Sequence, residues 1–257
     1  MRLSEQQLNH FKTFGFVVFR QLLSPAEVNT FRRELDAGLD ARIEGGKHDG
    51  KERFWASLND ADTPFISSLS DDPRFADAAE QLLGKDVIGI CADSNYYVGD
   101  TRWHPDISPS EFEAVKFTIY LEQLDGNSGA LRVIPGSHRE PYHSQIRRDM
   151  EDAYGVRPDE IPAYAFESTP GDVLVFNVAT WHSAFGGSTR RRMSTVQFYE
   201  DPQTPETTER VRQVIGGSVK SYFARFNHSM YSQYWRSIDS SRHQRWIRRM
   251  NEMGVLD

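Results

Sequence analysis

The chain has 257 residues, 38% of them hydrophobic and 12% aromatic, which is enough to build one domain with a substantial core. Its formal net charge of −7 argues against a general nucleic-acid-binding surface, which needs clustered positive charge. A mean hydropathy of −0.61 and the lack of an apolar run of about 20 residues argue against a membrane protein. We therefore expect a single domain over residues 1–257 that binds neither nucleic acid nor membrane.

Cysteine usage and the start of the chain bear on location. Cys91 is the single cysteine, which excludes an intrachain disulfide and a thiolate metal cluster. The opening residues "MRLSEQQLNHFKTFGF" lack the basic and apolar regions of a signal peptide. We therefore expect a cytoplasmic protein.

Helical patterns dominate residues 1–86, which we expect to form an N-terminal helical support. Ser4 and Gln7 form a capping-box pattern at the start of the first helix, and "GFVVF" is a short β-type run. Two further helices are predicted over residues 24–43 and 72–84.

The pattern changes to short strands over residues 87–200. These runs are rich in β-branched and aromatic residues, and turn sequences such as "LDGNSGA" separate them. Several strands without intervening helices favour a sandwich, barrel or jelly roll over a parallel α/β sheet. A charged insertion at residues 139–165 interrupts them. The predicted strands lie within residues 87–99, 114–124, 130–136, 172–185 and 192–200.

Residues 201–257 return to helical patterns. Trp235, Ile238, Trp246 and Met250 suggest an amphipathic face that packs against the rest of the chain. The overall plan is helices, then a β core, then helices.

The turn "RWHPDISPS", residues 102–110, carries His104 and Asp106 with one residue between them. Residues at that spacing on an extended chain point the same way. Alone, such a pair can hold a metal, form a hydrogen-bonded pair or have no function. A third donor, His182, follows an apolar strand late in the same β region. Two histidines and one carboxylate form the facial triad of non-haem iron oxygenases, although catalytic zinc accepts the same ligands.

The arginines of "GGSTRRRMSTVQFY" distinguish iron from zinc. On an extended strand Arg192 and Ser194 share one face, while Arg191 falls on the other, where we expect a solvated basic edge. An arginine and a serine that point together into a barrel suit a buried carboxylate. A buried arginine without an anion would be costly. This strand therefore favours an iron site that also binds a dicarboxylate.

Several of these pieces together resemble the phytanoyl-CoA dioxygenase branch of the Fe(II)/2-oxoglutarate dioxygenases. The similar segments are "FGFVVFRQLLSPAEV", "WHPD", "YLEQLDGNSGALRVIPGSH", "PGDVLVFN" with "TWHSA", and "RMSTVQFY". They span most of residues 5–200, and "NSGALRVIPGSH" beside the triad is specific. The resemblance implies a mainly β fold with flanking helices and a double-stranded β-helix core, also called a jelly-roll or cupin-like core.

The resemblance also implies roles for single residues. Iron would be held by His104, Asp106 and His182, and Arg192 would pair with the distal carboxylate of 2-oxoglutarate with help from Ser194. The loop from His182 to this arginine is one residue shorter than in many relatives, so Arg190, on the same face, is a rival for the pairing. The strands before and after the H-x-D turn would contribute further contacts to 2-oxoglutarate from Asn95 and Thr118.

The expected activity is oxidation of a small molecule, possible substrates including natural-product intermediates, with Fe(II), 2-oxoglutarate and O2, and with release of succinate and CO2. Relatives that halogenate replace the triad carboxylate with a small residue, so the retained Asp106 favours hydroxylation or a related C–H oxidation. Two alternatives remain open: a catalytically silent jelly-roll binding protein, and a zinc-dependent hydrolase. The substrate and the oligomeric state are not readable from the sequence.

Overall fold

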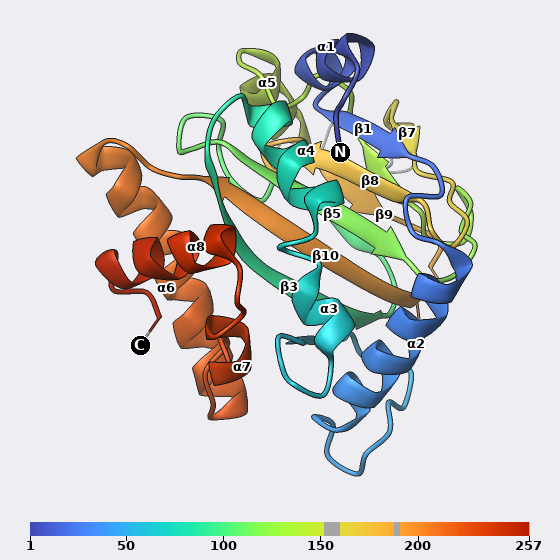
Figure 1. Cartoon of the computed structure of the whole chain (residues 1–257). Helices are drawn as coiled ribbons and strands as arrows, with labels where there is room; N and C mark the ends of the chain where they lie inside the picture. Colours follow the sequence, from blue (N-terminus) through green and yellow to red (C-terminus); the bar gives the residue numbers. More distant parts are fainter. Residues whose placement is uncertain (152–159, 188–190, 257) are drawn as a thin grey trace.

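The computed structural model describes residues 1–151, 160–187 and 191–256, the side chains of 149–151 excepted. Two antiparallel sheets face each other, and helices cover the outer face of the larger one (Figure 1). The predicted fold class, a jelly-roll core with flanking helices, is confirmed. No helix within the described residues combines the length and the apolar character needed to cross a membrane.

The larger sheet has six strands in the order β1-β8-β5-β10-β3-β2. Its long central strands pair antiparallel, β10 with β3 on one side and with β5 on the other. The strands are β1 Phe16–Phe19, β8 Val173–Asn177, β5 Ala114–Tyr120, β10 Arg191–Glu200, β3 Val87–Tyr97 and β2 Phe54–Ser57.

The smaller sheet has four short strands in the order β4-β9-β6-β7. The predicted strand region 172–185 divides into β8 and β9, which belong to different sheets, so the chain crosses from one sheet to the other just before His182. Strands β2, β4 and β7 were not predicted. The strands of this sheet are β4 Thr101–His104, β9 His182–Ala184, β6 Leu131–Val133 and β7 Tyr164–Ala165.

Helices α2, α4 and α8 contact the larger sheet, and the main hydrophobic cluster lies between them and its strands. The capping box predicted at Ser4 is present, and a second one forms at Ser24 with Glu27. The helices are α1 Glu5–Phe14, α2 Pro25–Asp40, α3 Pro64–Ser68, α4 Pro73–Leu83, α5 Tyr142–Glu151, α6 Pro205–Phe226, α7 Gln233–Arg236 and α8 Ser241–Glu252.

The alternation of side chains along β5 separates the two faces of the larger sheet. Val115, Phe117 and Ile119 belong to the cluster beneath the helices. Lys116 and Thr118 instead line a pocket between the two sheets. The inner face of the larger sheet therefore supplies polar groups to this pocket, while its outer face holds the helices.

Candidate active site

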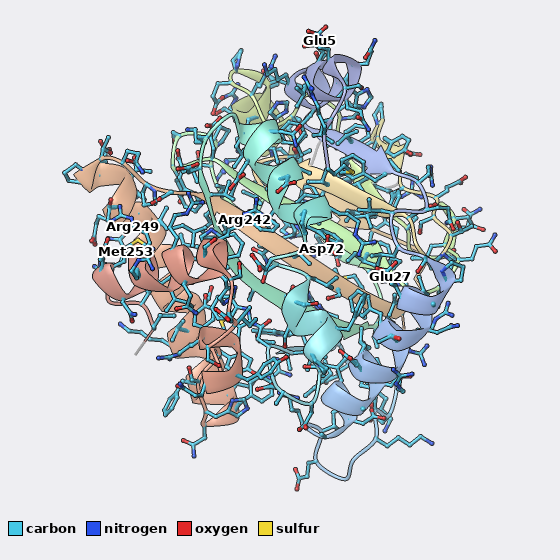
Figure 2. All side chains as sticks on the ribbon, viewed as in Figure 1. Glu5, Glu27, Asp72, Arg242, Arg249 and Met253 are labelled. Carbon is cyan, nitrogen blue, oxygen red and sulfur yellow. The ribbon has the colours of Figure 1, made fainter. Side chains whose placement is uncertain are left out.

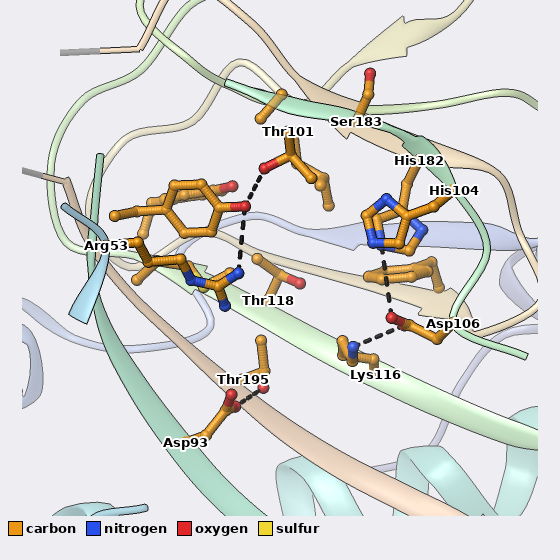
Figure 3. Close-up of a pocket in the computed structure, with 16 residues that line it drawn as sticks. Arg53, Asp93, Thr101, His104, Asp106, Lys116, Thr118, His182, Ser183 and Thr195 are labelled. Atoms are coloured by element: carbon orange, nitrogen blue, oxygen red, sulfur yellow. Dashed lines mark hydrogen bonds and ion pairs between the residues drawn. The ribbon is translucent and has the colours of Figure 1, made fainter. Parts of the chain in front are cut away.

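The pocket between the sheets gathers side chains from both of them (Figure 3). The smaller sheet contributes His104, at the end of β4, and His182, at the start of β9, and these two residues are partners in the strand ladder. Asp106 follows β4, where its backbone N–H donates to the carbonyl of Val178 at 2.9 Å. The antiparallel pairing of two short strands thus brings together residues that are far apart in the sequence.

The three predicted ligands form a group that could hold a metal ion, since their donor atoms all lie within 4.8 Å of one another. Asp106 Oδ1 lies 3.9 Å from His182 Nε2, and the two imidazole rings have centroids 4.3 Å apart. These separations suit donors that each bind one central ion at about 2.0–2.2 Å.

Backbone carbonyls fix the orientation of both rings. His104 Nδ1 lies 2.8 Å from the carbonyl oxygen of Arg102, and His182 Nδ1 lies 2.9 Å from that of Thr180. A ring that donates from Nδ1 to a carbonyl presents an unprotonated Nε2, the form that binds a metal. Both histidines are therefore prepared for coordination through Nε2.

The protonation states also suit a metal. Burial lowers the pKa of His182 to about 4, so its ring is neutral at pH 7. Burial alone would raise the pKa of Asp106, but the charge and the hydrogen bond of Lys116, together with the two neighbouring imidazoles, outweigh it and hold that pKa at about 2. At neutral pH the site therefore offers a neutral imidazole at His182 and a carboxylate at Asp106.

Lys116 contacts the triad, and the sequence analysis did not single it out. Its Nζ lies 2.6 Å from Asp106 Oδ2, on the carboxylate oxygen opposite the one nearest His182 (Figure 3). The lysine thereby orients the carboxylate. The alternation of side chains in "AVKFTIY" puts Lys116 on the same strand face as Thr118. This pattern could have predicted that Lys116 lies at the site.

The expected orientation of Arg192 is wrong. Its guanidinium points away from the pocket and pairs with Asp36 of α2 and with Glu122, each at 2.7 Å. The side chain of Ser194 lies on the same outward face, where its hydroxyl donates to the backbone carbonyl of Asp93. Arg192 ties the sheet to α2 here, and neither side chain lines the pocket.

The expectation of a solvated edge at Arg191 is also wrong, because this residue is 1% exposed. It alternates onto the inner face with Met193 and Thr195, which line the pocket. Its Cζ lies 5.0 Å from the centroid of the Tyr97 ring, and Nη2 donates to the carbonyl of Gly99 at 2.7 Å. Its Nε and Nη1 have no hydrogen-bond partner among the described residues.

Two glycines make room for this arginine. A Cβ atom built on Gly129 or on Gly187 would lie 1.4 Å from Arg191 Nη1. No larger residue fits at either position while the guanidinium keeps this place.

Of the other residues predicted to contact 2-oxoglutarate, Thr118 lines the pocket. Asn95 is fully buried; its Oδ1 accepts from Arg53 Nε at 2.9 Å, and its Nδ2 lies 3.8 Å from the sulfur of Met193. Arg190 lies outside the described residues.

Arg53 and Asp93 are pocket residues that the sequence analysis missed. Arg53 immediately precedes β2, a strand that was not predicted, so no pattern placed it at the site. Asp93 shares a strand face with Asn95, and that spacing was the available signal.

Comparison with known proteins agrees with this geometry. The family model described as "Phytanoyl-CoA dioxygenase (PhyH)" matches residues 11–194, more than half of the chain. An ectoine dioxygenase from Sphingopyxis alaskensis is 26% identical over 223 residues, which cover 73% of this chain and 72% of that protein. One from Nocardia farcinica is 31% identical over 152 residues, covering 52% of this chain and 51% of the relative.

Solved structures share the fold. HygX from Streptomyces hygroscopicus, with nickel and 2-oxoglutarate bound, matches with a TM-score of 0.66 at 19% identity, over 78% of this chain and 88% of that one. EctD from S. alaskensis with bound Fe matches with a TM-score of 0.60 at 21% identity, over 77% of each chain. Since the family model covers most of the sequence, the chain belongs to the phytanoyl-CoA dioxygenase family, as its motifs predicted, and is a non-haem iron, 2-oxoglutarate-dependent dioxygenase.

Proposed function

We propose that the pocket binds Fe(II) through His104, Asp106 and His182 and oxidises a C–H bond of a small molecule. The observation that carries this proposal is the convergence of two imidazoles and one carboxylate on one point. The iron, when bound, supplies activation of O2 coupled to the oxidative decarboxylation of 2-oxoglutarate, which gives succinate, CO2 and the oxidised substrate. Three protein ligands leave coordination positions for both co-substrates.

We assign the binding of the distal carboxylate of 2-oxoglutarate to Arg191 in place of Arg192. A fully buried guanidinium whose Nε and Nη1 find no partner among residues 1–151, 160–187 and 191–256 is costly unless an anion satisfies it. Nε and Nη1 together can donate to both oxygens of one carboxylate. Arg191 also lies against Tyr97, which lines the pocket. Thr118 and Asn95 would provide polar contacts nearby.

Arg53 is the other arginine at this end of the pocket, and its Nη1 lies 3.5 Å from the Tyr97 hydroxyl. Its Nε is already bonded to Asn95, and the residue is exposed. Leaving Arg53 without an anion therefore costs less than leaving the buried Arg191 without one. Arg53 is the second candidate for binding the same carboxylate.

The substrate is proposed to be a small molecule. The relatives named ectoine dioxygenase take their name from such a molecule. A natural-product intermediate is the narrower form of this proposal. The carboxylate of Asp106 fills the position that halogenation would require to be vacant, so we propose hydroxylation or a related C–H oxidation. The lone cysteine, Cys91, is buried and free, which supports the proposal of a cytoplasmic location.

The experiment that tests the function is an anaerobic titration of the purified protein with Fe(II) and then 2-oxoglutarate. We expect the visible charge-transfer band of the iron–2-oxoglutarate chelate in the wild type and its loss in Asp106→Ala. Tight metal binding without the band would favour the hydrolase alternative. The absence of metal binding would favour a silent binding protein.

A further inference from the structure

The pocket contains a carboxylate that the proposed iron chemistry does not use. Asp93 lies on the inner face of β3 and is the cross-strand partner of Thr195 on β10. The Thr195 hydroxyl donates to Asp93 Oδ1. Figure 3 places these two side chains together, apart from His104 and His182. Asp93 is therefore a second acidic group in the pocket, separate from the metal ligands.

Asp93 has no ion-pair partner among the residues that the structure describes. The two cationic side chains that line the pocket are Lys116 and Arg53. Lys116 is paired with Asp106, and Arg53 bonds to Asn95. Neither forms an ion pair with Asp93 among the described contacts. Burial raises the pKa of Asp93, and the positive charges of Lys116 and Arg53 offset this only in part.

A carboxylate taken out of water without a counter-charge is costly. Of the pocket-lining residues, the acidic ones are Asp93 and Asp106, and a bound metal would use Asp106. 2-Oxoglutarate is itself a dianion and is repelled by Asp93, so it cannot supply the missing charge. A cation on the remaining ligand, the molecule to be oxidised, can.

We infer that Asp93 recognises the substrate and that the substrate carries a cationic nitrogen, such as an ammonium or amidinium group. This inference rests on the proposed function, because it takes Asp106 as a metal ligand. The nitrogen would bind at Asp93, supported by Thr195, while the carbon to be oxidised lies beside the triad. The carboxylates of 2-oxoglutarate would instead bind at the cationic side chains of the site. The charge of each ligand would thus direct substrate and co-substrate to different parts of the pocket.

The test uses three probes that share one skeleton and differ in charge: cyclohexylamine, cyclohexanol and cyclohexanecarboxylate. Each is titrated anaerobically into the protein loaded with Fe(II) and 2-oxoglutarate, and perturbation of the chelate band reports binding. We expect the wild type to bind the amine at least about tenfold more tightly than the alcohol, the range for a hydrogen bond between charged groups. Asp93→Asn should abolish this preference, and Asp93→Lys should transfer it to the carboxylate.

The control is Asp239→Asn, which makes the same change of charge at an exposed residue outside the pocket and should leave the preference intact. A wild type that shows no preference for the amine, whether the three probes bind equally or none binds, overturns the inference. So does an amine preference that survives in Asp93→Asn. Loss of the chelate band in Asp93→Asn would instead place this residue at the co-substrate. If the band never forms in the wild type, the proposed function itself fails.

Discussion

Two consecutive arginines on β10 have opposite environments. Arg191 is fully buried on the inner face, and its Nε and Nη1 have no hydrogen-bond partner in the described part of the chain. Arg192 is about a quarter exposed and satisfied by the carboxylates of Asp36 and Glu122, which raise its pKa. One arginine is thus available for a ligand, whereas the other holds the sheet and α2 together.

Matched substitutions separate these roles. We expect Arg191→Gln to raise the apparent KM for 2-oxoglutarate by at least about tenfold, because a charge-assisted pair is worth about 1.5–3 kcal/mol. Arg192→Gln should leave that KM nearly unchanged and destabilise the fold by about 1–3 kcal/mol, since it removes the cationic partner of two carboxylates. Steady-state succinate assays and thermal melts measure the two effects. A raised KM in Arg192→Gln alone would restore the assignment made from the sequence.

The sequence identified the types of residue in the site better than the direction in which they point. Two histidines and an aspartate with the right spacing predicted the triad, and they converge. On β10, however, Arg191, Met193 and Thr195 alternate with Arg192, Ser194 and Val196, so both faces mix polar and apolar groups. A shift of the strand register by one residue moves every side chain to the opposite face. Because both faces of β10 mix polar and apolar residues, its sequence does not reveal which face points inward. In β5, where one face is wholly apolar, the orientation was readable.

At the scale of elements, the start of α2 is joined to the start of α4 by a small network of charges. Glu27 closes the capping box of α2 with Ser24 and accepts from Arg74 Nη2 at 2.6 Å. Arg74 also binds Asp72, the N-cap of α4. The network fixes the relative position of two helices that cover the larger sheet. Figure 2 shows Glu27 and Asp72 at these neighbouring helix ends.

This network predicts a pH-dependent stability. The hydrogen bond from Arg74 lowers the pKa of Glu27 from 4.5 to about 2. Because the folded pKa lies below the unfolded one, the stabilisation is present above pH 4.5 and is lost as the pH falls toward 2. We expect Glu27→Gln to reduce the free energy of unfolding by about 1 kcal/mol at pH 7, the value being discounted because the pair is partly exposed, and by less at pH 3.

Denaturant unfolding at both pH values measures this difference. Glu209→Gln is the control, since Glu209 pairs with Arg212 on the exposed surface of α6, where solvent screens the charges. It should have little effect at either pH. An equal loss of stability at pH 3 and pH 7 in Glu27→Gln would contradict the prediction.

At the scale of the whole molecule, the candidate site combines the two sheets. The smaller sheet and the turn after β4 carry the triad, whereas the larger sheet carries Lys116, Thr118 and Arg191. The fold class was predictable because short β-branched runs without intervening helices allow few architectures. The division of residues 172–185 between two sheets was not predictable, because a single apolar run does not show where the chain passes from one sheet to the other.

A bound metal should therefore stabilise the entire domain. With Ni(II) as a redox-inert probe at 100 times its dissociation constant, linkage gives about 2.7 kcal/mol. For a chain of this size that corresponds to a rise of about 5–10 °C in Tm. His182→Ala should keep the wild-type circular dichroism spectrum and lose the Ni(II)-dependent rise. An undiminished rise in that variant would place the bound metal elsewhere.

The unequal lengths of the strands have a consequence for local motion. The smaller sheet is built from strands of two to four residues, whereas β3 and β10 of the larger sheet have eleven and ten. Short ladders open at a lower free energy than long, buried ones. Backbone amides around His104 and His182 should thus exchange with solvent sooner than those of the central strands. The candidate metal ligands thus lie on or next to the layer with the short ladders, and we expect an ion to enter the pocket without unfolding of the domain.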